Sequence, residues 1–416
     1  MSAITAPHDH ASSGRPAPID DQSFPRLADR LSRWGLVAGG LGVVLTVGAG
    51  FVVPGIIYPA YLCVYLFFLG FGVGSLGLLL LHQLVGGLWG FIIRRPLEAA
   101  ASTLPFMALL FLPILFGVKT LYPWTDAAYV AAHPVVAKKA AYLSLGFWSA
   151  RAVLYHLIWS GLALYFRANS AAQDATDDPA PGRRNQILAA PGLILLFLSV
   201  TFSMVDWGMS TEPEWYSSIY GVMLLIGFAL SGLALAIVVA SNLRGVSALA
   251  RVITAEGLND LGNLLLAFTM LWAYMSFSQY LIIWMGNLAE EVPWYIERSY
   301  GAWQLVCGGL IVLHFFLPFF LLLVRDTKRD ASKVWKVAAF LALMQLVNDV
   351  WLIVPAYQSP HWAILLAVPL AVAALGGVFL WAYARELASR PLMPLHDPML
   401  AGVLESVAHK GHGGGN

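Results

Sequence analysis

The feature that most constrains this chain is a series of ten long apolar runs, each nearly free of charged residues. A bilayer core of about 30 Å needs roughly 20 apolar residues per helix, and the runs reach that length. They are continuous rather than alternating, which excludes a transmembrane β-barrel. We therefore predict an all-α integral membrane protein with ten transmembrane helices. The runs are residues 34–56, 59–87, 97–119, 143–167, 187–207, 218–241, 259–286, 300–324, 334–355 and 361–385.

Composition agrees with a membrane protein. Of the 416 residues, 59% are hydrophobic and only 11% are charged, whereas soluble domains carry about a quarter charged residues. This balance excludes a soluble enzyme, a fibrous repeat and a disordered chain. No apolar stretch precedes Trp34, so we expect no cleavable signal peptide.

The basic residues predict the orientation. With the N-terminus inside, four of the 24 Lys and Arg lie in outer segments, Arg151 lies within a span, and the remaining 19 lie inside. Basic residues concentrate on the cytoplasmic side of membrane proteins. We therefore expect both termini in the cytoplasm. The four outer residues are Lys119, Lys138, Lys139 and Arg298.

The two tails, residues 1–33 and 386–416, are rich in polar residues, Pro and Gly. We interpret them as flexible cytoplasmic tails. Their histidines could bind a metal ion, although such a composition is more typical of a solvated tail. These histidines are His8, His10, His396, His409 and His412.

The membrane domain, residues 34–385, contains an internal duplication. Weak matches recur in the same order in spans 2–5 and 6–9, which predicts two related four-helix bundles, about 59–207 and 218–355, flanked by spans 1 and 10. Both copies keep the same orientation, which disfavours the inverted repeats of many secondary transporters. The matched pairs are Lys119 and Gln279, Ser144 and Ser299, Trp148 and Trp303, His156 and His314, and Asp206 and Asp349.

Polar residues within the spans are the candidate functional residues, because ionisable groups are costly in lipid and usually mark function. Histidine titrates near neutral pH, and a buried carboxylate can load and release a proton. The candidates for a proton path, or for positions close to a quinone, are Lys119, Arg151, His156, Asp206, Gln279, His314 and Asp349.

Three other interpretations of these residues remain open. Asp206 and Asp349 lie in the outer half of their spans, where Lys119 or Arg151 could form structural ion pairs with them. A single histidine within a span is often only a hydrogen-bonding residue. His156 and His314 lie at similar depth and could instead ligate a b-type haem.

The outer loops combine aromatic and acidic residues. Aromatic residues form belts at membrane surfaces, and they are also enriched where proteins dock. We expect the loops around 208–217 and 287–299 to bind partner subunits. The candidate docking residues are Trp215, Glu290, Glu291 and Trp294.

The chain has only two cysteines, Cys63 and Cys307, and no C-x-x-C-H haem-attachment motif. Iron–sulfur clusters usually need four thiolates. If the protein takes part in redox chemistry, its metal centres lie in partner chains.

The segment from Tyr274 to Tyr295 contains Ser-Gln-Tyr, Trp-Met-Gly-Asn and Glu-Glu-Val-Pro-Trp. Together with Asp206–Ser217 and the turn Arg325–Arg329, it resembles the second NrfD-like (polysulfide-reductase-type) membrane subunit of alternative complex III, the bacterial quinol:cytochrome c oxidoreductase. The resemblance covers about Trp34 to Arg385, and ten spans in two four-helix bundles is that family's architecture.

The resemblance implies a subunit of the bacterial inner membrane that binds no cofactor of its own. Its partners would be a larger NrfD-like sister subunit, a periplasmic iron–sulfur protein, c-type cytochromes and lipid, but no nucleic acid. Haem c and iron–sulfur clusters would lie in those partners, and menaquinone or ubiquinone would be the quinone. The alternative function is a stand-alone secondary transporter, which the parallel repeat and the absence of obvious Pro- or Gly-broken helix pairs disfavour.

Overall fold

The computed structural model describes residues 23–176, 178–243 and 253–393, and within these ranges it is all-helical with no strand. Nine helical stretches in the described chain are long and apolar enough to cross a membrane, so the protein is a multi-pass membrane protein. They are Phe24–Val52, Pro54–Val85, Leu88–Phe116, Ala180–Thr211, Tyr220–Leu243, Ala255–Gly286, Ala302–Leu323, Ala331–Ala356 and His361–Ala388.

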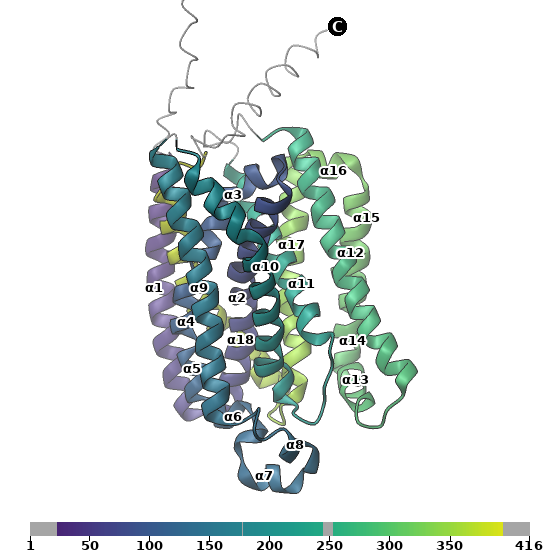
Figure 1. The fold of residues 1–416 in the computed structure, drawn as a ribbon. Helices are drawn as coiled ribbons and strands as arrows, with labels where there is room; N and C mark the ends of the chain where they lie inside the picture. The colour runs from purple at the N-terminus through teal and green to yellow at the C-terminus, as the bar shows by residue number, and fades with distance from the viewer. Residues whose placement is uncertain (1–22, 177, 244–252, 394–416) are drawn as a thin grey trace, which may run out of the picture.

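The remaining predicted span, 143–167, forms α9 (Leu145–Ala175), which is 31 residues long. It packs beside α10 (Ala180–Trp207) and runs along the same axis as the other long helices (Figure 1). Its polar side chains, which include Arg151, His156 and Arg167, make it less apolar than the other nine. The prediction of ten spans therefore depends on α9.

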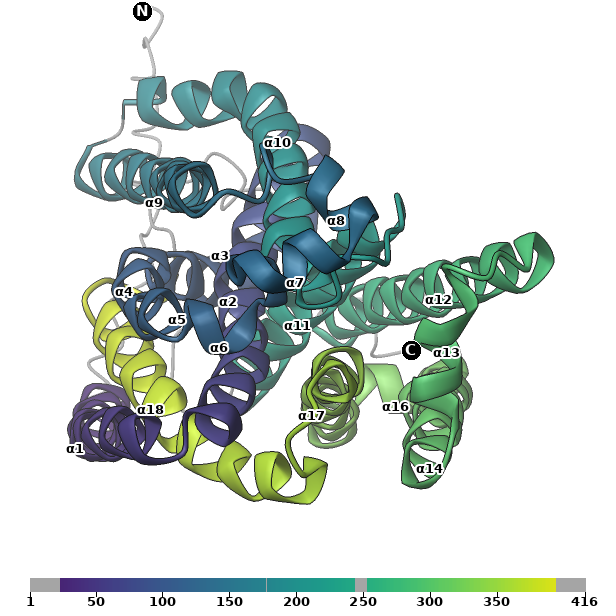
Figure 2. The same ribbon diagram turned by 90° about the horizontal axis from the view of Figure 1, so that it is seen from below.

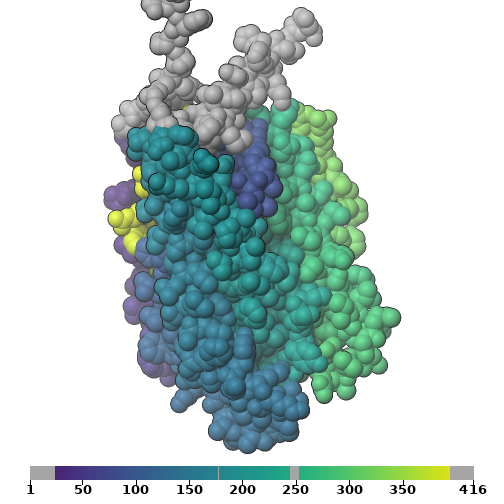
Figure 3. Space-filling model, viewed as in Figure 1, coloured from purple at the N-terminus to yellow at the C-terminus, as the bar shows by residue number. Residues whose placement is uncertain are grey.

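The helices pass back and forth along one axis, so that α1 (Ser23–Val52) begins and α18 (His361–Ala388) ends at the same end of the bundle (Figure 1). We call this the inner end, following the predicted orientation. The short helices α7 (Ala127–Ala132) and α8 (Pro134–Lys138) protrude at the opposite, outer end (Figure 3).

We describe the helices in the two groups predicted from the sequence, a division that stays a prediction. α2 contacts α3, α9 and α10, while α11 contacts α12 and α17. α2 and α11 also pack against each other at the centre of the molecule (Figure 2). The helices of the first group are α2 (Pro54–Val85), α3 (Leu88–Ala101), α4 (Leu104–Leu110), α5 (Leu112–Phe116), α6 (Val118–Leu121), α9 and α10, with η1 (Pro123–Thr125) and η2 (Met209–Thr211) at the outer end.

The second group contains a π-helix in the middle of its third member. π-Helical turns are rare and are often found at functional sites. The elements are α11 (Tyr220–Leu243), α12 (Ala255–Gly286), α13 (Val292–Ser299), α14 (Ala302–Gly309), the π-helix η4 (Leu310–Phe316), α15 (Leu317–Leu323), α16 (Arg325–Arg329), α17 (Ala331–Ile353) and η5 (Val354–Ala356).

The third crossing corrects two expectations. It is not continuous but divided among α3, α4 and α5, because Pro105 and Pro113 cannot donate to the helical ladder and each starts a new segment. Its counterpart α12 is unbroken, so the two groups do not share a pair of broken helices. The crossing also begins at Leu88 rather than 97, which places Arg94 and Arg95 within a helix and not in a loop.

α1 and α18 pack at backbone contact. A Cβ atom on Gly39 would lie 2.6 Å from the nitrogen of Val378, and one on Gly42 would lie 2.5 Å from that of Ala374. α1 starts at Ser23, so part of the predicted tail 1–33 is helical. The tail histidines (His8, His10, His396, His409 and His412) and the basic residues Arg15, Arg244, Arg251 and Lys410 lie outside the described residues.

Candidate functional site

The predicted polar residues of the first group form an ion pair at the outer end. Arg151 on α9 donates to both carboxylate oxygens of Asp206 on α10, from Nε at 2.8 Å and from Nη2 at 2.7 Å. Tyr155 donates its hydroxyl to Asp206 Oδ2 at 2.9 Å. The Asp206 carboxylate therefore accepts three hydrogen bonds, two of them from a cation, and such charge-assisted hydrogen bonds are among the strongest in proteins.

The Arg151 guanidinium is itself held from several sides. Its Nη1 donates to the carbonyl of Tyr142 at 2.9 Å, and its Cζ lies 3.8 Å from the centre of the Tyr142 ring. Burial raises the pKa of Tyr142, which lies in the turn before α9, to about 12. Lys119 does not join this cluster, because it is exposed and forms no ion pair with a described residue. Arg151 and Asp206 thus match the structural interpretation.

His156 lies in a box of aromatic rings. Its ring stacks on Trp207 at 5.3 Å between centres and lies 5.0 Å from Phe111. Nδ1 is 2.7 Å from the carbonyl of Ala152, and Nε2 is 2.8 Å from the hydroxyl of Tyr65. Both ring nitrogens are occupied, which leaves His156 no free position for haem ligation.

The hydrogen bonds of His156 accept either protonation state. In the neutral ring, Nδ1–H donates to the Ala152 carbonyl, and Nε2 accepts from the Tyr65 hydroxyl. In the charged ring, Nε2–H donates to Tyr65, whose own proton then turns to the carbonyl of Met107 at 3.2 Å. A proton can therefore be taken up here by rotation of one hydroxyl, without loss of a hydrogen bond.

Asp349 on α17 has no cation beside it among the described residues. Its carboxyl group is fully buried, and the amide nitrogen of Gln345 donates to Oδ1 at 3.2 Å. Oδ2 of Asp349 and Oε1 of Gln345 have no hydrogen-bond partner among the described residues. Asp206 and Asp349 were predicted from the same sequence signal, but only Asp206 has a cation as partner.

His314 is unpartnered in the same way. It is fully buried in η4, and neither of its ring nitrogens has a hydrogen-bond partner in the described part of the chain. Its ring lies 3.9 Å from that of Trp272 on α12. His314 follows Trp303 by eleven residues, whereas His156 follows Trp148 by eight, so the duplication does not place the two histidines at equivalent positions.

An apolar cavity of about 600 Å³ opens beside these residues, between α12, α13, η4 and α17. Cavities of this size accept a small molecule. The wall contains Trp272, whose ring contacts that of His314, and Asn348, which precedes Asp349. Other residues of the wall are Ser276, Phe277, Tyr280, Trp294, Tyr295, Leu310, Phe315 and Trp351. The Tyr274–Tyr295 segment thus supplies much of one wall.

Gln279 does not line this cavity. Its side chain is buried and accepts a hydrogen bond from the Ser217 hydroxyl at 2.5 Å, which ties α12 to the loop before α11. Its sequence counterpart Lys119 is exposed. The two residues therefore have different environments and different roles.

The predicted docking residues separate into two kinds. Trp215 and Trp294 are each 4% exposed and stack on each other at 4.5 Å with an angle of 11°, so their rings pack inside the chain, and their docking role stays a prediction. Glu290 is exposed and Glu291 is partly exposed, as a docking role needs. The fully buried Arg298 packs over Trp294 and pairs with Glu212, which fixes α13 to the outer loop.

A hollow of about 960 Å³ lies on the outer surface between these loops. Four glutamates line it, and one of them, Glu297, has a pKa above its ordinary value because it is partly buried and close to Glu212. The four are Glu212, Glu214, Glu290 and Glu297. The hollow on the outer surface is therefore lined by acidic side chains.

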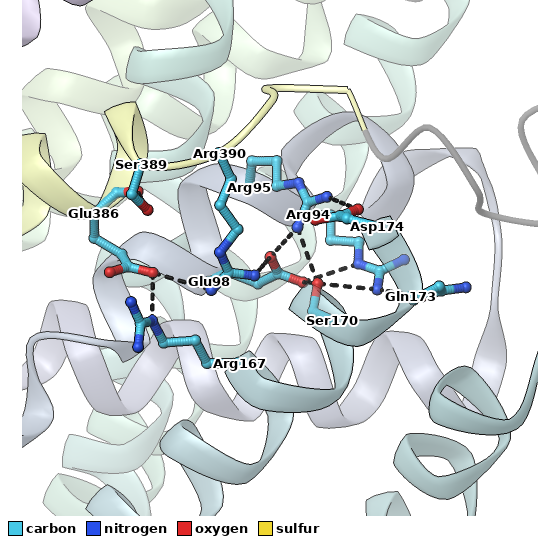
Figure 4. Close-up of polar contacts among 10 residues, drawn as sticks. All are labelled: Arg94, Arg95, Glu98, Arg167, Ser170, Gln173, Asp174, Glu386, Ser389 and Arg390. Atoms are coloured by element: carbon cyan, nitrogen blue, oxygen red, sulfur yellow. Dashed lines mark hydrogen bonds and ion pairs between the residues drawn. The ribbon is translucent and has the colours of Figure 1, made fainter. Parts of the chain in front are cut away.

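Sequence analysis missed a charged network at the inner end (Figure 4). Glu98, 7% exposed, accepts from Arg94 at 3.0 Å and from Arg95 at 2.7 Å. Ser170 on α9 donates to it at 2.7 Å. Arg390, just after α18, lies 3.8 Å from Glu98 and donates to Glu386 on α18 at 3.0 Å. The network joins α3, α9 and α18. In a helix, residues four apart such as Arg94 and Glu98 lie on one face and can pair. The predicted span begins at residue 97, so this spacing was not considered within a helix.

Comparison with known proteins adds no family: no protein-family model matches the chain, and no curated protein sequence matches it.

Proposed function

We propose that this chain is a ten-helix membrane subunit of a bacterial quinol:cytochrome c oxidoreductase of the alternative complex III type, as the second (ActF-type) NrfD-like subunit. It supports quinol oxidation and proton conduction and holds no redox cofactor of its own. Electrons leave through haem c and iron–sulfur clusters of partner subunits. The proposal includes an inner-membrane location with both termini in the cytoplasm.

The observation that carries this proposal is the contrast between the apolar cavity and the buried polar groups beside it. A carboxylate buried without a cation costs several kcal/mol when ionised. In the proposal Asp349 therefore carries its proton on Oδ2, the oxygen without a partner. The Asp349 carboxyl group then serves as a site where a proton is held and from which it is released.

The shape and wall of the cavity support a quinol as the molecule served by this proton site. Aromatic side chains such as Trp272 and Tyr280 suit a planar ring, and about 600 Å³ accommodates such a ring with the start of an isoprenoid tail. Asn348 and Ser276 supply polar groups for its oxygen atoms. Menaquinone and ubiquinone both belong to this class.

Purification of the tagged full chain from its native membranes in a mild detergent tests the complex. We expect co-elution with c-type haem absorbance and with quinol:cytochrome c activity. A colourless single chain would instead support the secondary transporter and overturn the proposal. A periplasm-only reporter fused after the C-terminus should stay inactive, and strong activity would overturn the orientation.

Proton handling is tested by Asp349→Asn, which keeps the shape of the side chain and removes the acid. We expect the variant complex to assemble, with slower turnover and altered proton release in liposomes. His156→Gln tests the first group in the same assay. Normal turnover and normal proton release in both variants would remove these residues from the proposed proton path.

A further inference from the structure

We propose that the inner end of the α1–α18 pair binds the headgroup of an anionic phospholipid. A groove of about 490 Å³ lies between the first turns of α1 and the last turns of α18. It is lined by polar and basic side chains, namely Asp29, Ser32 and Arg33 from α1, and Arg385 and Ser389 from α18.

The groove has an excess of positive charge. Arg33 pairs with Asp29, and both side chains are largely exposed, at 78% and 57%. Arg385 has no carboxylate partner among the described residues; its nearest aromatic contact is the ring of Trp381, with Cζ 6.0 Å from the ring centre. The neighbouring Glu386 does not neutralise it, because Glu386 is bound to Arg167 and Arg390.

The level of these charges along the helices identifies the kind of anion. Below Arg33, the 19 residues from Trp34 to Val52 carry no charge, and they span ~28 Å in a helix. This length matches the hydrocarbon core of a bilayer, about 30 Å. Arg33 therefore lies at the height of the lipid headgroups. The same holds for Arg385, since Trp362–Ala384 is also uncharged.

The surface below the groove suits acyl chains. Trp34 is 68% exposed, Val37 53% and Leu41 62%, all on the outward side of α1. The close glycine contacts between α1 and α18 hold the two helices in a fixed relation, which keeps the groove open. Basic grooves between membrane helices on the cytoplasmic side are known sites for anionic headgroups. The orientation used here is the proposed one.

Native mass spectrometry of the full chain in detergent tests the site, with phosphatidylglycerol, phosphatidylcholine of the same acyl chains, and inorganic phosphate as probes. We expect retention of phosphatidylglycerol in preference to phosphatidylcholine. In the double variant Arg33→Gln, Arg385→Gln, phosphatidylglycerol binding should weaken by roughly thirtyfold, or about fivefold for each guanidinium removed. Only folded protein is counted, so the measurement is independent of yield.

The matched control is Arg183→Gln, Arg184→Gln, which removes two exposed arginines at the start of α10. It should leave phosphatidylglycerol binding unchanged. Equal binding of the two lipids, or an equal loss in both double variants, would overturn the proposal. Binding of inorganic phosphate with the same dependence on Arg33 and Arg385 would replace the lipid with a free anion and would overturn the lipid assignment.

Discussion

The two four-helix groups place a buried aspartate in very different surroundings. In the first group, Asp206 accepts hydrogen bonds from Arg151 and Tyr155. In the second, Asp349 is as deeply buried, and within the described part of the chain it has neutral donors and no cation. Asp206 thus belongs to an ion pair that stabilises the fold, whereas Asp349 is the carboxyl group for which we propose a role in proton transfer.

The histidines follow the same division. His156 has a partner at each ring nitrogen, whereas His314 has none among the residues that the structure describes. An unpartnered buried polar group costs about 1–3 kcal/mol, which a protein retains where the group has a use. In the proposed function, the second group retains this unpartnered histidine at a cost in stability because it lies beside the proton site.

The largest effect should come from breaking the ion pair of the first group. Asp206→Ala leaves Arg151 buried without its anion, and we expect destabilisation by about 3–5 kcal/mol. Thermal unfolding of the full chain in detergent measures it. Lys119→Gln, which removes an exposed cation at the same end, is the control and should change nothing. A stable Asp206→Ala protein would remove the structural role of the pair.

Trp294→Ala should come next, because it removes half of the buried stack with Trp215 and the ring below Arg298. Truncation of a buried Trp costs about 3–5 kcal/mol, and we expect the lower end of this range because Arg298 keeps its partner Glu212. The loss should be seen in the isolated chain. If the isolated chain is unaffected and only binding of partner subunits suffers, the docking role first predicted for Trp294 is correct.

These two cases show what sequence could and could not provide. The apolar runs predict the helices, since membrane length alone sets them, and the cost of intramembrane charge singles out Asp206 and Asp349. Which aspartate has a cation as partner depends on the rotation of α9 and α17 about their axes, which the sequence does not specify. Likewise, the preference of tryptophan for interfaces does not distinguish an exposed ring from a buried stack such as that of Trp215 and Trp294. The Glu98 network was not predicted, because the predicted third span begins at residue 97, whereas the helix begins at Leu88 and includes Arg94 and Arg95.

Replacing His156 or His314 with phenylalanine compares the two groups again, with smaller expected changes in stability. His156→Phe leaves the Ala152 carbonyl and the Tyr65 hydroxyl without this partner, and we expect a loss of about 1–3 kcal/mol. His314→Phe removes an unpartnered group and should leave thermal stability unchanged or raised, while turnover of the complex falls. Equal destabilisation by both exchanges would mean that His314 has partners after all.

The smallest effect concerns the acidic hollow on the outer face. Burial and the nearby Glu212 raise the pKa of Glu297, so its charged form is disfavoured in the folded protein. Stability should rise as the pH falls from neutral toward the ordinary value of 4.5, because the folded state binds the proton more tightly. Glu297→Gln should stabilise the chain at pH 7 by less than about 0.5 kcal/mol and flatten this part of the pH profile. An unchanged profile would contradict the assignment.

Infrared difference spectroscopy of the purified protein tests most directly whether Asp349 is the free acid of the second group. The account predicts a protonated-carboxyl band in the wild type at neutral pH that is absent from Asp349→Asn. Asp206→Asn should leave the band unchanged, because Asp206 forms an ion pair with Arg151. A wild type without the band, or an Asp349→Asn protein that retains all of it, would contradict the account.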